Sequence, residues 1–438
     1  MAKDDLNLWI GSIEEMGPFR CHPDGTLYVY ADPADADPGD PCGIYIPAEE
    51  AVKRTLTKIH GTANWSQAKR NEAMAYLKDE SAPVFGEIEV PMIPCLNGVL
   101  DLSDPLEIGL QEHSSLYGFT AQIPHLYNPF ATCPRIEQFL LETFEGSREM
   151  VQFVYELLGY SILPTQFLRK AVLLLGPSGT GKSTVLYLLE KLVGQGASSF
   201  VSLHQLSDDR FAAADLFGKL VNIGGDLDST VIKNTGQFKS LTGGDLIRAD
   251  KKYAKPVSFR SSATMWFAAN EAPPSSDHSD AYRGRWVVLP MTFQPKKLDF
   301  MLKGKLSTSA EMEGLFRHAV EGAAQLLARG DFRIPAAAAE AHEEFVLRTD
   351  QLQAFLHHAE GVFSGDTGRD QLWATYQAWS EAEGGRPVKR SILLQRSAER
   401  WGESERGYVI KTSTVNGDVV HSRESLNTLR NDLAKETA

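Results

Sequence analysis

The 438-residue sequence has few cysteines and no long apolar run. Its four cysteines are far apart and form no CxxC pair, so neither a zinc site nor a disulfide framework is indicated. No apolar segment approaches the roughly 18 residues that a membrane-spanning helix needs. The first residues also lack the basic and apolar segments of a signal peptide. These absences predict a cytoplasmic protein without a membrane partner.

Basic residues are also fewer than acidic residues, and the net charge is −13. Much of the acidic excess lies in residues 1–50, where eleven Asp and Glu residues face only Lys3 and Arg20. The remainder of the chain is close to balanced, so a local basic surface for a nucleic acid is not excluded.

The sequence GPSGTGKST, Gly176–Thr184, follows the apolar run Ala171–Leu175 and precedes the periodic segment Val185–Val193. A G-x-x-x-x-G-K-[ST] loop between a strand and a helix binds phosphates through backbone N–H groups at the helix N-terminus. Lys182 is expected to reach the β- and γ-phosphates, and Ser183 to hold Mg²⁺. The alternative is a glycine turn without a ligand. The predicted cofactors are ATP and Mg²⁺, and the predicted binding residues are Gly176, Pro177, Ser178, Gly179, Thr180, Gly181, Lys182, Ser183 and Thr184.

Short apolar runs recur on both sides of this loop and alternate with helical patterns. Such alternation predicts a doubly wound α/β fold, with buried parallel strands and the ligand at their carboxyl ends. The predicted strands are 171–175, 200–203, 219–223, 264–269 and 286–290.

The regions around this core have their own patterns. Asn97-Gly98 lies between apolar runs and predicts a tight hairpin, and helices are expected over 66–78 and, as one segment, over 134–158. Near the C-terminus, three helical patterns precede two apolar strands joined by Val415-Asn416-Gly417, which suggests a winged helix. The predicted divisions are an acidic α+β domain (1–132), a helical linker (133–165), the ATPase core (166–310), a helical extension (311–348) and a winged-helix-like DNA-binding domain (349–438).

Several polar residues follow the predicted core strands. Asp226 and Asp228 come after the 219–223 strand, and we expect Asp226 to hold the metal and Asp228 to assist the attacking water. Asp228 could instead cap the next helix. Asn270 ends the 264–269 strand, where its amide could contact the γ-phosphate or orient water.

Arg283 and Arg285 precede the last predicted strand, and either could act as a finger on the triphosphate of a neighbouring subunit. That role requires a ring of subunits. The alternative is an arginine in a surface or intrasubunit ion pair.

An insertion between the acidic strand and Asn270 is strongly basic. From Leu246 to Arg260 there are five basic residues and one acidic residue, and the apolar segments 246–249 and 257–259 can pair as a hairpin. Basic side chains beside an aromatic ring suit contact with single-stranded phosphates. The predicted DNA-contacting residues are Lys251, Lys252, Tyr253 and Lys255.

These motifs occur in a characteristic order: GPSGTGKST, GKLVNIGGDLD, FKSLTGGDLIRADKKYAKPVSF, TMWFAAN and DAYRGRWVVLPMTF. In this order they resemble the superfamily 3 helicase domain of phage, plasmid and poxvirus primase-helicases, and the likeness covers roughly residues 85–420. The resemblance implies an AAA+-like hexameric ring that moves 3′ to 5′ on single-stranded DNA. It assigns Lys182 and Ser183 to ATP and Mg²⁺, Asp226 to the acidic motif, Asn270 to the sensor, Lys252 to the DNA hairpin and Arg285 to the leading finger position.

Relatives commonly have Glu where this chain has Asp226, and adjacent arginines where Arg283 and Arg285 flank Gly284. Only about 85 residues precede the matching region, too few for a primase domain, so a separate primase or polymerase is a possible partner. The expected setting is a bacterial or phage-infected cell.

Three functions remain open: a replicative DNA helicase of a mobile element, an ATP-switched origin-binding initiator with little unwinding, and a small-molecule kinase. The basic hairpin and the arginines speak against the kinase, whose chemistry needs neither.

Overall fold

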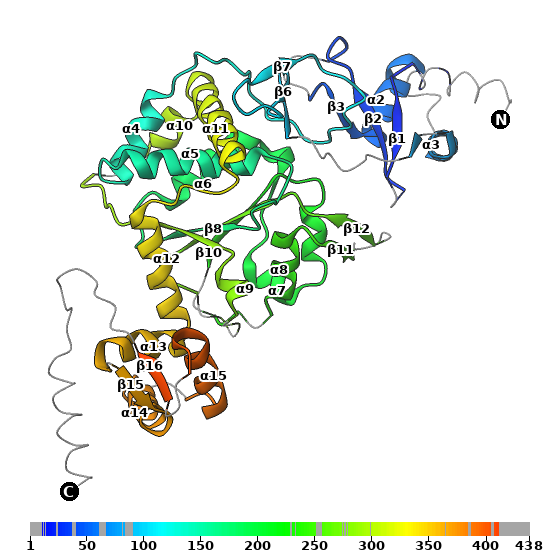
Figure 1. Cartoon of the computed structure of the whole chain (residues 1–438). Coiled ribbons are helices and arrows are strands. Elements are labelled where there is room, and N and C mark those ends of the chain that lie inside the picture. Colours follow the sequence, from blue (N-terminus) through cyan, green and yellow to red (C-terminus); the bar gives the residue numbers. More distant parts are fainter. Residues whose placement is uncertain are drawn as a thin grey trace, which may run out of the picture. The chain divides into compact units, whose positions relative to one another are not determined.

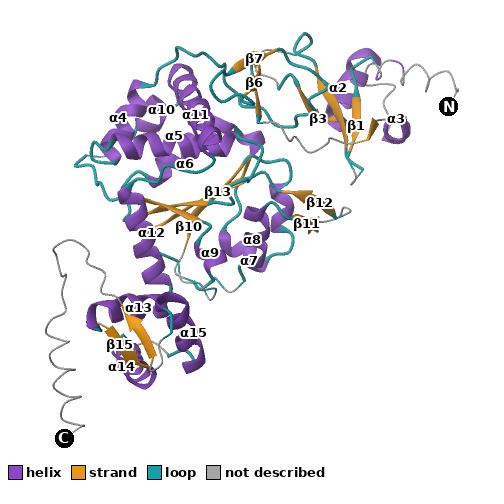
Figure 2. Ribbon diagram, in the orientation of Figure 1, coloured by secondary structure: helices purple, strands orange, loops and turns teal. Residues whose placement is uncertain are grey.

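The computed structural model divides the chain into two compact units, Met1–Phe345 and Val346–Ala438, which Figures 1 and 2 show in one view. No helix in the part of the chain that the structure describes is long and apolar enough to cross a membrane. The described residues are 11, 13, 15–22, 25–36, 41–60, 67–80, 82–83, 91–227, 230–232, 234–250, 256–273, 275, 277, 279–297, 299–363, 365–383, 387–403 and 407–410.

The first unit is built around a parallel five-stranded sheet in the order β14-β8-β13-β10-β9. The phosphate-loop strand β8 therefore lies between the last two strands of the sheet to appear in the chain. The predicted parallel α/β fold is confirmed. The strands are β8 (Ala171–Leu175), β9 (Ser198–Ser199), β10 (Val221–Leu227), β13 (Thr264–Ala269) and β14 (Trp286–Pro290).

Strand β13 shows why the strands of a buried parallel sheet have apolar residues at every position. All six of its residues are buried, because helices cover both faces of the sheet. Trp266 donates its indole N–H to Ser161 on one face, at 2.8 Å, while the next residue, Phe267, contacts Phe238 on the other. Alternate side chains of a strand point to opposite faces, so each face of this sheet has its own aromatic anchor.

Figure 2 shows the helices in two groups, one on each side of this sheet. The helices on the Ser161 side are α4 (Pro134–Thr143), α5 (Arg148–Ile162), α6 (Lys182–Val193), α10 (Leu302–Leu306) and α11 (Ser309–Arg329). Those on the Phe238 side are α7 (Leu203–Asp208), α8 (Gly236–Gly243) and α9 (Asp280–Arg283). Further helical segments are η2 (Gln195–Ala197), η3 (Ala212–Leu216) and α12 (Ala336–Thr349).

Helices α5 and α11 cross closely through glycine. A Cβ atom added at Gly159 would collide with the backbone of Ala323 and Ala319, and one added at Gly322 would collide with the carbonyl of Tyr155. An ion pair also joins the two helices, because the exposed Arg329 donates to the buried Glu156 carboxylate at 2.7 Å.

The single helix expected over 134–158 is wrong, since the structure has two helices there, α4 and α5. Glu145 and Gly146 between them have positive φ angles of 52° and 84°, a backbone region that helices of L-residues do not use. Ser147 then caps α5, accepting from the backbone N–H of Met150 at 3.3 Å.

Two strand predictions also need correction. The strand expected over 200–203 lies earlier, at β9, because Ser202 and Gln205 form a capping box that starts α7 at Leu203. The strand expected over 219–223 begins at Val221 and continues to Leu227, so Asp226 lies within β10 rather than beyond it.

The N-terminal part of this unit contains two small sheets. Helices α2 (Ala48–His60) and α3 (Gln67–Glu80) accompany a sheet in the order β3-β2-β1-β4, and the hairpin expected at Asn97-Gly98 joins β5 to β6. The strands are β1 (Phe19–Cys21), β2 (Leu27–Ala31), β3 (Ile44–Pro47), β4 (Ala82–Pro83), β5 (Met92–Cys95), β6 (Gly98–Asp101) and β7 (Gly109–Gln111).

Among its described residues, the second unit combines three helices with a two-stranded antiparallel sheet around Phe355, Tyr376 and Tyr408. The predicted strand from residue 407 pairs with β15, and its expected partner at 418–422 lies outside the described residues. The elements are α13 (Gln351–Val362), β15 (Gly365–Gly368), α14 (Arg369–Ala382), α15 (Arg390–Trp401) and β16 (Gly407–Ile410).

Candidate nucleotide-binding and DNA-contacting site

The predicted phosphate loop connects the carboxyl end of β8 to the N-terminus of α6. Gly176 has a φ of +155°, and a Cβ there would collide with the carbonyl of Met291, the residue after β14. Gly181 precedes α6 with a φ of +96°. Glycine is required at both positions, for close packing at the first and for a left-handed backbone at the second. The loop therefore delivers the N-terminus of α6 to the carboxyl ends of the strands, and helix N-termini bind anions through their backbone N–H groups.

Lys182 is the first residue of α6, and its side chain is buried against the phosphate loop. Its Nζ donates to the carbonyl oxygens of Gly176 at 2.5 Å and Pro177 at 2.8 Å. It also donates to Oδ1 of Asn270, at 2.9 Å. The structure thus brings together the predicted lysine and the predicted sensor, which are 88 residues apart in the chain.

The predicted acidic residues are described only in part. Asp226 pairs in register with Ala268 of β13, two residues before Asn270, and a bulge occurs between Gly224 and Asp226. The Asp226 backbone therefore lies on the strand adjacent to the one that Asn270 follows. Asp228 lies outside the described residues, so both assignments remain predictions.

A pocket of about 740 Å³ opens at this loop and is within the range of small-molecule sites. Ser183 and Thr184 line it, as do several residues that the sequence analysis missed. Lysines and an arginine give the lining a positive excess over Glu142 and Asp299, and the latter is paired with Lys305 at 2.6 Å. The basic residues and the two phenylalanines that follow β14 in the sequence could have indicated that this segment belongs to the site. The missed lining residues are Arg135, Phe139, Phe293, Lys297, Phe300, Lys303 and Lys305.

The finger candidates have different environments. Arg283 is buried and paired with Asp280, three residues earlier. Arg285 is half-buried; its Nε donates to Thr242 Oγ1 at 2.8 Å, and its other nitrogens donate to backbone carbonyls, including that of Lys239 at 3.2 Å. Burial, and then neighbouring Arg169, hold the pKa of Arg285 below its ordinary value. In this subunit, Arg285 therefore holds α8, which leads into the hairpin.

A carboxylate network fixes the same helix. Asp277 accepts from Thr235, from Lys239 Nζ at 2.7 Å and from the Ser279 backbone N–H through its other oxygen at 3.0 Å. Burial opposes ionisation, but these hydrogen bonds together hold the pKa of Asp277 well below its ordinary value.

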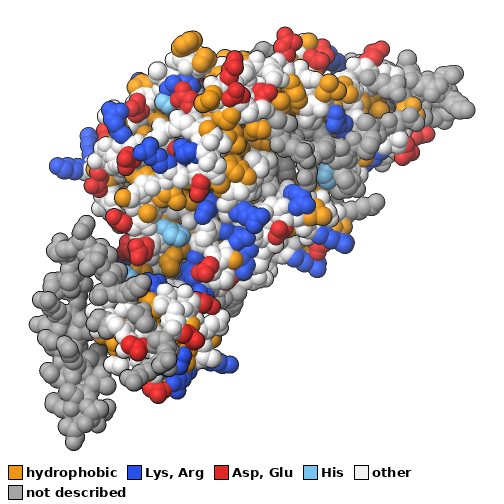
Figure 3. Space-filling model, in the orientation of Figure 1, with side chains coloured by type: hydrophobic (Ala, Val, Ile, Leu, Met, Phe, Trp, Pro, Cys, Tyr) orange, Lys and Arg blue, Asp and Glu red, His pale blue; other side chains and the backbone are white. Residues whose placement is uncertain are grey.

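The expected hairpin is present. Strands β11 (Leu246–Ala249) and β12 (Val257–Arg260) are antiparallel, with Ala249 opposite Val257. Arg248 and Arg260 are exposed on it, and Figure 3 shows basic side chains gathered around this part of the visible face. The predicted tip residues Lys251, Lys252, Tyr253 and Lys255 lie outside the described residues.

Comparison with known proteins gives two family matches. Residues 42–145 match a family described as D5 N terminal like, and residues 174–285 match a family of unknown function, DUF5906. The second match runs from the end of β8 to Arg285 and so contains the phosphate loop, Asn270 and the hairpin. No curated protein matches the sequence.

Among solved structures, the chain is similar to an apo structure of the NrS-1 C-terminal region, with a TM-score of 0.50 and 15% identity. That match covers 92% of this chain and 87% of the other. A second, A-form apo structure of the same region has a TM-score of 0.49 and 14% identity, covering 82% of this chain and 78% of the other. The first of these shows a shared fold. The D5 N-terminal-like match over residues 42–145 fits the resemblance to the superfamily 3 primase-helicases that the ordered motifs carry.

Proposed function

We propose that this protein is an ATP-dependent DNA translocase that unwinds DNA during replication of a phage, plasmid or integrated element. The observation that carries the proposal is the hydrogen bond between Lys182 and Asn270 at the mouth of the 740 Å³ pocket. It supports the proposal because an ammonium group suited to phosphate and a neutral polar group lie together at the carboxyl ends of parallel strands. The antiparallel hairpin inserted before β13 adds a surface for a DNA strand.

The residues of the pocket fit a nucleoside triphosphate. The first turn of α6 and the side chains of Lys182, Lys297 and Lys303 favour polyphosphate, whereas Phe139, Phe293 and Phe300 provide apolar surface for a base. Phe300 is 91% exposed, so a bound base would cover it.

Ser183 and Asp226 would hold Mg²⁺, which neutralises charge between the β- and γ-phosphates when bound. Lys182 would exchange its bonds to the loop carbonyls for phosphate oxygens. Asn270 would then orient the attacking water without adding negative charge. Arg285 of an adjacent subunit is the leading candidate to stabilise the transferred charge, within a hexameric ring.

Strand displacement tests the proposal. A duplex with a single-stranded 3′ tail should be unwound in the presence of Mg²⁺ and ATP. A duplex of the same sequence with a single-stranded 5′ tail should not be unwound. The Lys182→Ala variant provides the nucleotide-dead control.

ATP hydrolysis without displacement of either substrate would contradict the helicase proposal and favour an ATP-switched initiator. Displacement of only the 5′-tailed duplex would retain unwinding but reverse the proposed polarity.

A further inference from the structure

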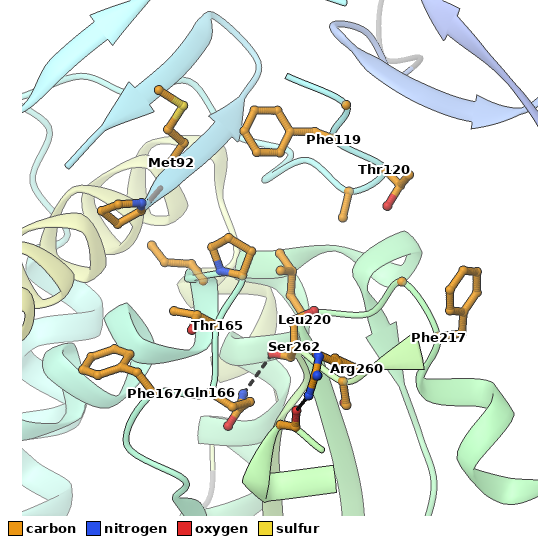
Figure 4. Close-up of a pocket in the computed structure, with 18 of the residues that line it drawn as sticks. Met92, Phe119, Thr120, Thr165, Gln166, Phe167, Phe217, Leu220, Arg260 and Ser262 are labelled. Carbon is orange, nitrogen blue, oxygen red and sulfur yellow. Dashed lines mark hydrogen bonds between the residues drawn. The ribbon is translucent and has the colours of Figure 1, made fainter. Parts of the chain in front are cut away.

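A second cleft, of about 770 Å³, lies at the other end of the core strands. Its lining comes from the loops that lead into β8, β10 and β13, including Gln166, Leu220 and Ser262, whereas the phosphate loop follows β8. Figure 4 shows Met92, Phe119 and Thr120 of the N-terminal part facing these loops across the cleft. This cleft is therefore separate from the candidate ATP site.

The cleft has basic groups and no described acidic lining residue, although the protein carries a net charge of −13. His22, Arg169 and Arg260 line it. Arg169 is exposed, and its φ of +56° is unusual for a residue other than glycine. After burial, Arg169 also lowers the pKa of Arg285, whereas Asp245 and Asp277 raise it. The basic residues that line the cleft, with no described acidic residue among them, favour an anionic ligand.

The cleft also offers aromatic surface. Phe167 is 40% exposed, while Phe217 packs against His22 with their ring centroids 4.6 Å apart. Figure 4 shows Phe119, Phe167 and Phe217 on three sides of the opening. Aromatic rings beside arginines suit an unstacked base attached to a phosphate.

Side-chain hydrogen bonds hold the loops that form the floor of the cleft. Gln166 is buried, accepts from the hydroxyl of Tyr160 at 3.0 Å and donates to the carbonyl of Ser262 at 2.9 Å. Arg260 donates to the carbonyl of Gly244 at 2.8 Å. Since Gly244 precedes β11 and Arg260 ends β12, this bond closes the root of the hairpin beside the cleft.

We propose that this cleft binds a nucleotide unit of single-stranded DNA, with the phosphate on Arg169 and Arg260 and the base against Phe167 or Phe217. The inference rests on the proposed DNA translocase function and adds a contact beyond the hairpin tip. A strand that follows the hairpin reaches its root at this cleft. The N-terminal part contributes Met92 and Thr120 to the wall of this cleft.

The test measures binding of a fluorescent oligo-dT to the full chain with Mg²⁺ and a non-hydrolysable ATP analogue, across a salt titration. Arg169→Gln should reduce the slope of log affinity against log salt by about one, because one phosphate contact is lost. Phe167→Ala should weaken binding by about 5- to 100-fold at fixed salt, because a stacked base loses its platform. The exposed Arg54→Gln is the matched control and should leave both oligo-dT binding and ATP hydrolysis unchanged.

The outcomes separate this inference from the function on which it rests. If the wild-type chain does not bind oligo-dT, both proposals fail. If it binds but Arg169→Gln and Phe167→Ala behave as Arg54→Gln does, the cleft assignment alone is overturned. If thymidine monophosphate displaces oligo-dT at an equal nucleotide concentration, the cleft holds a free nucleotide, which contradicts the strand assignment.

Discussion

The Lys182 ammonium group and the Asn270 side chain form a direct link between the phosphate loop and the neighbouring strand. In the absence of phosphate, the bonds to Asn270 and to two loop carbonyls keep a buried positive charge solvated by the protein. Under the proposed function, a bound triphosphate would take over the Lys182 ammonium group. The Asn270 amide would then be available to the γ-phosphate or to water.

Replacing Asn270 with Ala should affect turnover more than nucleotide binding. The amide is expected to act on charge that develops during hydrolysis, and loss of one such group costs about 10²-fold in kcat. Affinity for a fluorescent ATP analogue should change by less than about 3-fold. Steady-state hydrolysis and equilibrium titration measure the two effects, with the exposed Asn128→Ala as control. Equal losses of nucleotide affinity and turnover would show that Asn270 mainly holds the phosphate loop in place rather than acting during hydrolysis.

The Asp277 network predicts a pH-dependent contribution to stability. Because the pKa of Asp277 is lowered in the folded state, its stabilisation is present above the ordinary pKa of 3.8 and is lost as the pH falls below it. Asp277→Asn should lower the free energy of unfolding by about 1.5–3 kcal/mol at pH 7. The difference from wild type should begin to shrink as the pH falls below about 5 and should continue to shrink at pH 3 and lower, toward the lowered pKa of the folded state. Denaturant titrations at each pH measure it, with Asp79→Asn as control, and a constant difference would contradict the assigned cause.

Part of the site could be predicted from sequence because its residues occupy fixed places relative to strands. Lys182 and Asn270 follow β8 and β13, and parallel strands bring their carboxyl ends together. Phe300 and Lys297 could not be placed in the same way. They lie in the irregular segment between β14 and α10, where no helical or strand periodicity gives their place relative to the phosphate loop.

At the scale of elements, the crossing of α5 and α11 holds the helical layer beside the sheet. Small residues allow the two backbones to approach, and Gly159 and Gly322 have no room for a side chain. Trp266 connects the sheet to the same layer by its bond to Ser161 of α5. The position of β13, and of Asn270 after it, therefore depends on the packing of α5 against α11.

Gly159→Val should destabilise the first unit strongly. The added side chain meets backbone atoms of α11, which cannot rotate away, and overpacking of a core usually costs about 1–3 kcal/mol or more. Gly304→Ala is the matched control, because its Cβ would meet nothing within 4 Å and Ala favours a helix. Thermal unfolding of the two variants provides the measurement. An unchanged unfolding temperature for Gly159→Val would show that the helices can separate at little cost.

Element boundaries were predictable where local chemistry sets them. The capping box of Ser202 and Gln205 was visible in the sequence and explains why α7 replaces the expected strand. The break between α4 and α5 was harder to infer, because apolar residues continue at helical spacing on both sides of Glu145 and Gly146. Gly146 and the N-cap residue Ser147 were the available sequence signal, and the positive φ angles of Glu145 and Gly146 mark the break in the structure.

At the scale of the whole molecule, the proposed ring requires each ATP site to be completed by its neighbour. Arg285 is bonded to Thr242 of α8 within its own subunit, and α8 leads directly into β11. If Arg285 moves to a neighbouring triphosphate, it must release α8. This exchange would couple nucleotide binding in one subunit to the hairpin of the next.

Mixing two inactive variants tests completion of the site between subunits. Lys182→Ala lacks the phosphate-binding lysine and Arg285→Ala lacks the finger, so each alone should hydrolyse little ATP. A mixture should regain activity, because an intact loop from one variant can meet an intact arginine from the other. Native mass measurement should show six subunits in the mixed ring. No recovery in a confirmed mixed ring would assign Arg285 a role within its own subunit.

The most direct measurement is the rate of ATP hydrolysis with and without single-stranded DNA. Wild-type protein should hydrolyse ATP with Mg²⁺, and oligo-dT should increase the rate. Lys182→Ala should lower hydrolysis by at least about 10²-fold, whereas the exposed Lys78→Ala should leave it unchanged. Loss of turnover with a retained unfolding temperature would support the phosphate-loop assignment. Hydrolysis that persists in Lys182→Ala, or that does not respond to DNA in the wild type, would contradict a DNA-dependent ATPase at this loop.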